Sequence, residues 1–392
     1  MNIRNRLSRK FNFSGMTAYF FILFIIEFVR GAFLVSYLPS YASEQLHFSL
    51  SVIGLAVSVH YLMDNAVKVF AGYLIDRFST RIVLFTGILL SIISIMLVVH
   101  AQSEWEILTA TALLGIGGSP VWLVCLSGVQ EECRASQMSM LYLFWMCGLG
   151  LGPVVMNFLM DVDDQVVFNI LIGMLCACGL LALTAKSARR SGISKLSLAA
   201  QLKMLWERIA KTGFLLPSMI LQTTAGGLLV PLLSPFATQH IGLSHSELSI
   251  SLIAGGVSAL LILVPAGKWI DRLGGKWFLI GGFGIFALTV FMLTFSNTFI
   301  ETVFLSMILG ASYASLLPAW NAYLSRYVPQ DSVGAGWGLI STIEGIGVVA
   351  GPALGGWMAE RVSASFPFWM AAVIFAGIAC YYLFSRTENL IG

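Results

Sequence analysis

The segment Gly72-Tyr-Leu-Ile-Asp76-Arg77-Phe-Ser-Thr-Arg81 recurs about 195 residues later as Gly267-Lys-Trp-Ile-Asp271-Arg272-Leu-Gly-Gly-Lys276. Three matches in the same order at nearly one offset indicate an internal duplication, so the sequence predicts two homologous halves. The other two matches are Pro120-Val-Trp122 with Pro318-Ala-Trp320, and Gly152-Pro153 with Gly351-Pro352.

The composition indicates that both halves lie in a membrane. Of the 392 residues, 58% are hydrophobic and only 10% are charged, and the mean hydropathy is +0.87. Soluble domains carry about 25% charged residues. A helix needs about 20 apolar residues to cross a bilayer. We therefore predict an all-α polytopic protein with twelve membrane helices at about 16–39, 50–75, 82–99, 107–129, 138–160, 166–185, 214–236, 248–270, 277–295, 302–324, 333–357 and 367–384.

Six helices fall in each half. We predict an amino-terminal six-helix bundle at 1–185, a basic cytoplasmic linker at 186–212 and a carboxy-terminal six-helix bundle at 213–392. Two parallel six-helix repeats, related by an axis along the membrane normal, are typical of the major facilitator fold, in which the substrate site lies near the bilayer midplane.

Charge is distributed unequally between the two membrane faces. Of the 22 Lys and Arg residues, 19 fall in the amino-terminal segment, the linker, the carboxy-terminal tail and the loops on their side. Acidic residues such as Glu44, Asp161 and Glu360 fall on the other side. Under the positive-inside rule both termini are cytoplasmic, which predicts a multi-pass cell-membrane protein.

The duplicated loop follows the second helix of each half and resembles the signature loop of the major facilitator superfamily. Its glycine permits close helix contact, its aspartate can accept hydrogen bonds at a helix end, and its cations suit the cytoplasmic interface. The loop is therefore either a conformational latch or a plain topology-determining basic loop. The candidate latch residues are Gly72, Asp76, Arg77, Arg81, Gly267, Asp271, Arg272 and Lys276.

Five ionisable residues occur inside the first two helices. Glu27 and Arg30 are three residues apart, and His60, Asp64 and Lys68 are spaced by four, so each set shares one helix face. A charge at the bilayer centre costs about 2.5–3.5 kcal/mol on insertion scales. These residues therefore line a polar site that binds substrate or protons, or they form buried ion pairs.

The second half lacks this charge. When the two repeats are aligned, the five ionisable residues correspond to uncharged residues near Thr223, Gly226, Gly255, Ala259 and Leu263. The only acidic residue that we place within its helices is Glu344. A charged wall in one half and an apolar wall in the other suit an amphiphile, with a polar head and acyl tails.

Trp122 and Trp145 lie in the middle of their helices rather than in the interfacial belts where tryptophan usually concentrates. An indole ring can stack against a sugar and donate a hydrogen bond, or it can simply pack. The sequence contains no phosphate-binding G-x-x-x-x-G-K-[ST] motif, and its six cysteines have no metal-site spacing. We therefore expect no cofactor and no metal, and transport driven by an ion gradient.

These residues resemble a known family. Glu27-Phe-Val-Arg30-Gly, Ser58-Val-His60-Tyr-Leu-Met-Asp64, Ser119-Pro120-Val-Trp122 and the segment Gln137–Trp145 are similar to the LtaA-type lipoteichoic-acid glycolipid flippases of Gram-positive bacteria. The resemblance implies a proton-coupled antiporter that moves a diacylglycerol-linked disaccharide from the inner to the outer leaflet. It places the headgroup at Glu27, Arg30, Asp64, Trp122 and Trp145, and we take Glu27, Asp64 and His60 as the proton-coupling candidates. Lys68 has no counterpart that we associate with the family's site.

Two other functions compete with this interpretation. A proton-coupled multidrug exporter of the same superfamily also uses membrane carboxylates and an apolar cavity. A membrane-embedded enzyme or a receptor is less consistent with the duplicated helices, because the sequence contains no nucleophile–base or phosphate motif. We expect the partners to be the glycolipid, protons and membrane lipids, with no nucleic acid, and we expect a monomer.

Overall fold

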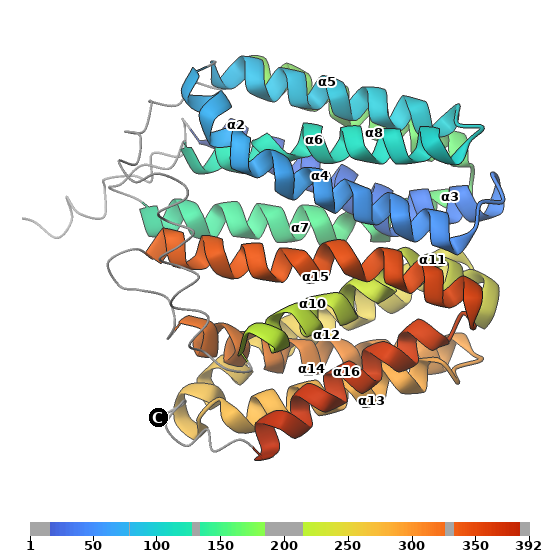
Figure 1. Ribbon diagram of the computed structural model, residues 1–392, viewed down its shortest axis with the longest axis vertical. Helices are drawn as coiled ribbons and strands as arrows, with labels where there is room; N and C mark the ends of the chain where they lie inside the picture. Colours follow the sequence, from blue (N-terminus) through green and yellow to red (C-terminus); the bar gives the residue numbers. More distant parts are fainter. Residues whose placement is uncertain (1–15, 78, 128–133, 185–214, 326–332, 385–392) are drawn as a thin grey trace, which may run out of the picture. The chain divides into compact units, whose positions relative to one another are not determined.

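The structure is a computed structural model that describes residues 16–77, 79–127, 134–184, 215–325 and 333–384 (Figure 1). Within these ranges the chain is helical and contains no strand, and it forms the twelve predicted helical runs. The first run is α2 (Thr17–Gly31), η2 (Ala32–Tyr37) and α3 (Leu38–Glu44), and the seventh is α10 (Leu215–Leu229), η4 (Val230–Leu232), α11 (Leu233–Pro235) and η5 (Phe236–Ile241). The others are α4 (Leu50–Arg77), α5 (Thr80–Val99), α6 (Glu104–Ser127), α7 (Arg134–Met160), α8 (Asp164–Thr184), α12 (His245–Leu273), α13 (Lys276–Leu293), α14 (Phe299–Ser325), α15 (Val333–Arg361) and α16 (Phe366–Phe384).

Ten of these runs are long and apolar enough to cross a membrane, counted over the described residues; α6 and α15 fall outside that count. Helix is the form expected here, because a span in lipid must satisfy its backbone hydrogen bonds internally. Proline lies inside five of the helices, among them Pro120 in α6 and Pro318 in α14. Membrane helices tolerate proline where neighbouring helices compensate for the lost hydrogen bond.

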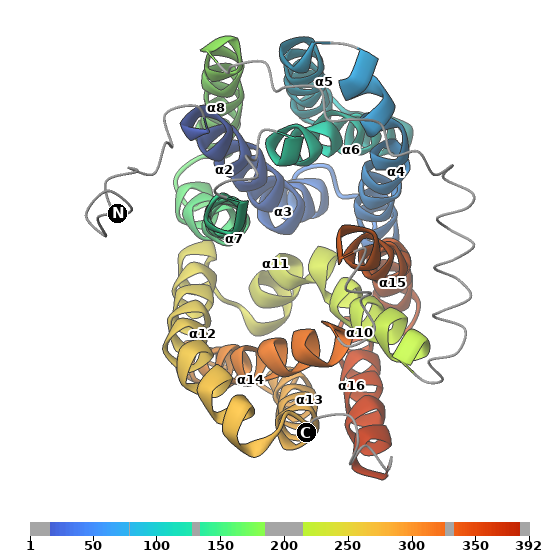
Figure 2. The same cartoon turned by 90° about the vertical axis from the view of Figure 1, so that its left-hand side faces the viewer.

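The chain forms two compact units. The first contains Met1–Tyr37, Leu62–Met156 and Val162–Ile193, and the second contains Leu38–Tyr61, Asn157–Asp161 and Ser194–Gly392. In the first unit, α5 packs against α6 and α8, and α2 packs against the same two helices (Figure 2). The predicted linker at 186–212 lies outside the described residues, and the two predicted bundles, 1–185 and 213–392, stay a prediction.

In the second unit, α12 packs along α14, α10 along α15, and α13 against both α14 and α16. Its core is a cluster of buried apolar residues that includes Phe283, Trp320 and Phe375. Where α12 and α14 cross, a side chain on Gly310 would overlap the backbone of Gly255. Small residues thus let these two helices approach backbone to backbone, as is common in membrane proteins.

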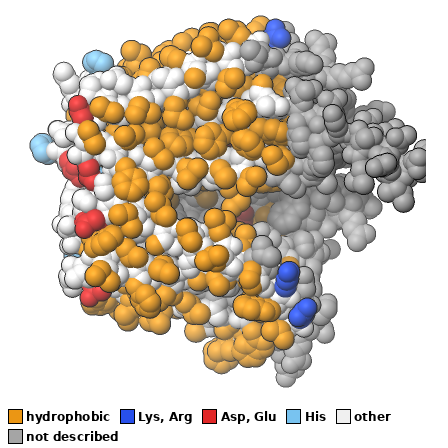
Figure 3. All heavy atoms as spheres, turned by 180° about the vertical axis from the view of Figure 1, so that it is seen from behind, with side chains coloured by type: hydrophobic (Ala, Val, Ile, Leu, Met, Phe, Trp, Pro, Cys, Tyr) orange, Lys and Arg blue, Asp and Glu red, His pale blue; other side chains and the backbone are white. Residues whose placement is uncertain are grey.

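The outer surface matches a lipid environment. Large apolar side chains are exposed on most helices; Leu260, Leu261 and Phe304 are more than 60% exposed. Figure 3 shows hydrophobic side chains over most of the drawn face, with Asp and Glu at one end of the helices and Lys and Arg at the other. This distribution confirms the prediction of a multi-pass membrane protein.

Candidate functional site

Arg30 lies between two carboxylates in the first unit. Its Nη2 is 2.8 Å from Oε2 of Glu27, one turn earlier on α2, and its Nη1 is 3.9 Å from Oδ1 of Asp64 on α4. The Glu27 and Asp64 side chains are each 5% exposed and that of Arg30 is 14% exposed. Two of the three charged side chains come from the predicted face of α2, and the third comes from α4. We call Glu27, Arg30 and Asp64 the charged triad.

Close helix contacts hold the triad in place. Ser119 of α6 donates a hydrogen bond of 2.8 Å from its hydroxyl to the carbonyl oxygen of Asp64, which ties α6 to α4. On α7, a Cβ added at Gly148 would lie 3.1 Å from the Cβ of Glu27 and 2.5 Å from the carbonyl oxygen of Phe24. Glycine at 148 therefore lets α7 approach α2 directly beside the triad.

The two predicted tryptophans lie on the helices that make these contacts, α6 and α7. Trp122 is one helical turn beyond Ser119, and Trp145 is one turn before Gly148. The indole rings of Trp122 and Trp145 lie 6.5 Å apart, and Trp122 also makes an edge contact with Tyr142 at 5.4 Å. Both tryptophans are half-buried. The five residues predicted to bind the headgroup thus lie in one unit, as a cluster of charged side chains and a pair of indole rings.

The remaining predicted site residues are His60, Lys68 and the latch candidates. His60 is 1% exposed and its ring lies 5.2 Å from that of Tyr61. The side chain of Lys68 lies outside the described residues, as do the side chains of the latch candidates Asp76, Arg77 and Asp271. Among the remaining latch candidates, Arg81 and Arg272 are exposed at the basic ends of their helices, while Lys276 and Gly267 are half-buried and the surroundings of Gly72 are not described. The latch hypothesis therefore stays a prediction.

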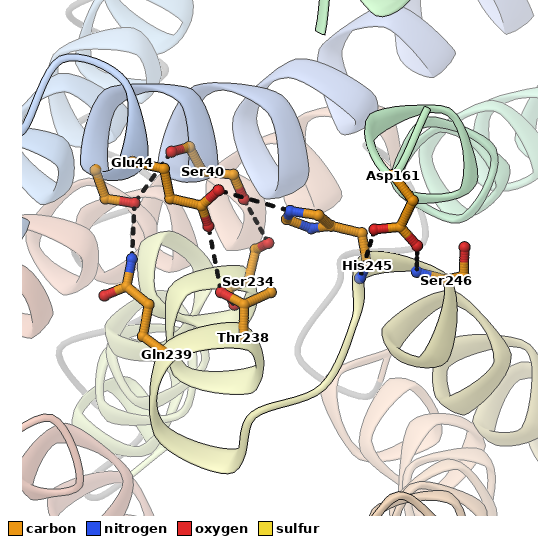
Figure 4. A network of polar contacts seen from close by, with 9 residues as sticks. Ser40, Glu44, Asp161, Ser234, Thr238, Gln239, His245 and Ser246 are labelled. Atoms are coloured by element: carbon orange, nitrogen blue, oxygen red, sulfur yellow. Dashed lines mark hydrogen bonds and ion pairs between the residues drawn. The ribbon is translucent and has the colours of Figure 1, made fainter. Parts of the chain in front are cut away.

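At the acidic ends of the helices, a set of contacts that the sequence analysis missed joins segments far apart in the chain (Figure 4). Within the second unit, the hydroxyl oxygens of Ser40 and Ser234 lie 2.7 Å apart and both side chains are fully buried. Thr238 donates to Oε1 of Glu44 over 3.4 Å, and Gln239 donates to Ser43 over 3.2 Å. The sequence separations of these pairs are 194 to 196 residues, which is the offset of the internal repeat. Equivalent segments of the two repeats thus contact each other, as across a two-fold axis.

The amino terminus of α12 lies in the same network. The Asp161 carboxylate accepts hydrogen bonds from the backbone N–H groups of His245, at 3.1 Å, and Ser246, at 2.7 Å. The next free N–H, that of Glu247, donates to the side chain of Ser244 in a capping box. An anion at a helix amino terminus is favoured by the helix dipole. The imidazole of His245 in turn lies 3.8 Å from the Glu44 carboxylate.

These contacts can be checked by cross-linking. The two hydroxyl oxygens are so close that cysteines at positions 40 and 234 should form a disulfide on mild oxidation. In the double variant Ser40→Cys, Ser234→Cys, with a protease site inserted in 186–212, the two fragments should stay joined on a non-reducing gel and separate after reduction. Each single variant is the control. Failure of the double variant to cross-link would contradict the contact.

Comparisons with known proteins agree with the fold and with the resemblance. The sequence model of the Major Facilitator Superfamily matches residues 19–222 and again residues 215–390, once for each repeat. Curated relatives named proton-coupled antiporter flippase LtaA, from Staphylococcus aureus strains MSSA476 and USA300, are 29% identical over 366 residues, which is 92% of each chain. The crystal structure of the nucleoside transporter NupG superposes with a TM-score of 0.75 at 15% identity, covering 94% of this chain and 98% of NupG.

The family match covers nearly the whole chain, the fold is that of a solved transporter, and the similarity predicted from the residues of the first two helices extends to curated flippases. The chain therefore belongs to the Major Facilitator Superfamily, and its sequence is similar to those of the curated LtaA flippases.

Proposed function

We propose that this protein is a proton-coupled antiporter that flips a diacylglycerol-linked disaccharide, the glycolipid anchor of lipoteichoic acid, from the inner to the outer leaflet. The observation that carries the proposal is the charged triad, whose Glu27, Arg30 and Asp64 lie on two helices of the first unit. The indole rings of Trp122 and Trp145, 6.5 Å apart in the same unit, supply the aromatic part of the proposed site. Carboxylates and a guanidinium bind sugar hydroxyls, and indole rings cover the C–H faces of sugars. The curated LtaA relatives, which are named proton-coupled antiporter flippases, support lipid flipping and proton coupling.

The apolar second half supplies the other part of the proposed site. The repeat mates of Asp64 and Lys68 are Ala259 and Leu263, which carry no polar group. Acyl tails gain about 0.8 kcal/mol for each methylene that leaves water. We propose that the disaccharide binds to the charged triad and the two tryptophans, while the tails lie against apolar residues of the second half.

Orientation follows from the charges at the helix ends. With both termini cytoplasmic, Arg81, Lys268 and Arg272 face the cytoplasm, and the contacts around Glu44 and Asp161 lie on the outer side. Protons enter from the outer side and leave on the inner side, while the lipid headgroup moves outward. We further propose that the protein acts as a monomer in the cell membrane of a Gram-positive bacterium.

Binding measurements separate this proposal from its alternatives. Purified protein should bind the intact glycolipid at least about tenfold more tightly than the free disaccharide, because losing only two buried methylenes already costs that factor. Diacylglycerol alone should also bind at least about tenfold more weakly, because it leaves the triad without sugar hydroxyls. A lipophilic cation that drug exporters carry is the fourth probe. Equal affinity for disaccharide and glycolipid would favour a sugar transporter, and tight binding of the cation alone would favour a drug exporter.

A further inference from the structure

A second polar pair lies inside the second unit. Glu344 of α15 accepts a hydrogen bond at its Oε1 from the indole N–H of Trp320 on α14, at 3.3 Å. Trp320 is 3% exposed, and its ring makes an edge contact with Phe283 at 5.8 Å. Core packing therefore fixes the indole, and its N–H fixes the position of the carboxylate.

Glu344 has no cationic partner among the residues that the structure describes. The ion pairs found there join Arg30 to Glu27 and Asp64, and His245 to Glu44. The titratable group that interacts with Glu344 electrostatically is the phenol of Tyr313 on α14, which is uncharged at neutral pH. Helix α10 carries no titratable residue. Other elements that pack against α15 also carry titratable residues. These are Cys380, Tyr381 and Tyr382 of α16, Tyr323 of α14, and His60 and Tyr61 in the part of α4 whose Gly54 and Ser58 contact α15.

A carboxylate in this place needs a compensating charge. Glu344 is half-buried in α15, which the sequence predicts to span the membrane, and its hydrogen-bond donor, Trp320, is neutral. Keeping a bare negative charge there costs several kcal/mol. Binding a proton removes the charge, and the resulting carboxyl group still accepts the Trp320 hydrogen bond through its carbonyl oxygen.

The internal repeat relates this pair to the proposed headgroup site. The offset that aligns Gly152-Pro153 with Gly351-Pro352 also aligns Trp145 with Glu344, and Trp122 aligns with Trp320. In the first unit the aligned pair is two indole rings 6.5 Å apart. In the second unit it is an indole hydrogen-bonded to a carboxylate. The two halves thus retain one paired arrangement, and one ring has been replaced by an acid.

We propose that Glu344, held by Trp320, is a second proton-binding site of the transport cycle. This inference rests on the proposed proton-coupled function. The Glu344 carboxylate takes up one proton from water to form the neutral acid and later returns it to water, with no redox step and no other reactant. The proton is thereby carried in the half of the protein that lacks the charged triad.

Infrared difference spectra recorded between high and low pH on the full-length purified protein test this proposal without any lipid substrate. The parent should show a carbonyl band of a protonated acid that the isosteric variant Glu344→Gln lacks. Trp320→Phe, which keeps a ring but removes the donor, should retain the band and displace its midpoint by about one pH unit. Glu360→Gln, at the exposed end of the same helix, should retain the Glu344 band.

Identical difference spectra for the parent and Glu344→Gln would overturn the proposal. If Glu344→Gln does not fold, the spectrum of Trp320→Phe tests the proposal instead. A carbonyl band with the same position and the same midpoint pH as in the parent would then overturn the proposal. Because no glycolipid is present, a negative result here is distinct from failure of the proposed function, which the binding comparison tests. The proposed role would also be overturned if Glu344 titrates in the parent but glycolipid transport by Glu344→Gln depends on the pH gradient as it does in the parent.

Discussion

Replacing Arg30 by lysine should reduce glycolipid transport into the outer leaflet of proteoliposomes at least about tenfold. One guanidinium reaches Glu27 at 2.8 Å and Asp64 at 3.9 Å through two different nitrogens. A lysine ammonium keeps the charge but has one nitrogen, so it cannot hold both carboxylates in a planar fork. Losing one hydrogen bond to a charged group costs about 1.5–3 kcal/mol, which corresponds to tenfold or more.

The matched control is Arg361→Lys, the same exchange at an exposed position at the end of α15. It should transport like the parent. Both variants should insert and purify in comparable amounts, because the net charge is unchanged. Transport by Arg30→Lys at the parental rate would show that the triad is a structural ion-pair cluster rather than part of the substrate site.

Converting Glu27 to glutamine or Asp64 to asparagine should abolish the acceleration of transport by a pH gradient. A proton-driven antiporter needs a carboxylate that binds a proton in one state and releases it in another, and an amide cannot do this at any pH. Each amide also leaves Arg30 with one charged partner instead of two. The measurement compares the initial rate of fluorescent glycolipid flipping with and without an inward proton gradient, for the parent and both variants.

An exposed acidic residue at the acidic ends of the helices supplies the control. Glu106→Gln removes a carboxylate at the start of α6 whose side chain is fully exposed, and it should leave the gradient response intact. If both triad amides respond to the gradient as the parent does, neither Glu27 nor Asp64 carries the coupling proton. His60, buried one turn before Asp64, would then be the remaining candidate on these two helices.

The sequence was sufficient to predict the helices and to group the charged candidate residues by helix face, because each of those predictions depends on local spacing. Glu27 and Arg30 share a face because they are three residues apart, and Asp64 follows His60 by four. The Arg30–Asp64 contact between two helices could be proposed only as one of several pairings, since spacing does not say which helix faces which. The structure shows which pairing forms, with Arg30 3.9 Å from Asp64 as well as 2.8 Å from Glu27.

The network at the acidic ends of the helices was not predicted, although part of its signal was readable. Ser244 and Glu247 have the spacing of a capping box. The separation of Ser40 from Ser234, 194 residues, is close to the repeat offset. Serine and threonine are common in membrane helices, however, so their presence alone does not predict a contact. The backbone N–H groups that Asp161 binds cannot be predicted from residue types, because every residue except proline has one. The acidic residues were therefore useful for orientation only.

The π-helical turns at η2 and η5 have a consequence for how the repeat contact opens. A π-helical turn contains about one more residue than an α-helical turn. If the π-helical turn moves along the chain, the segment between its old and new positions rotates by about 100° about the helix axis. Such a register shift at η2 would rotate α3 and carry Ser40 and Glu44 off their partners at once, with no hinge loop and with the helix still hydrogen-bonded. The contacts of Ser40 and Glu44 would then be made or broken in steps of one residue along the first helix.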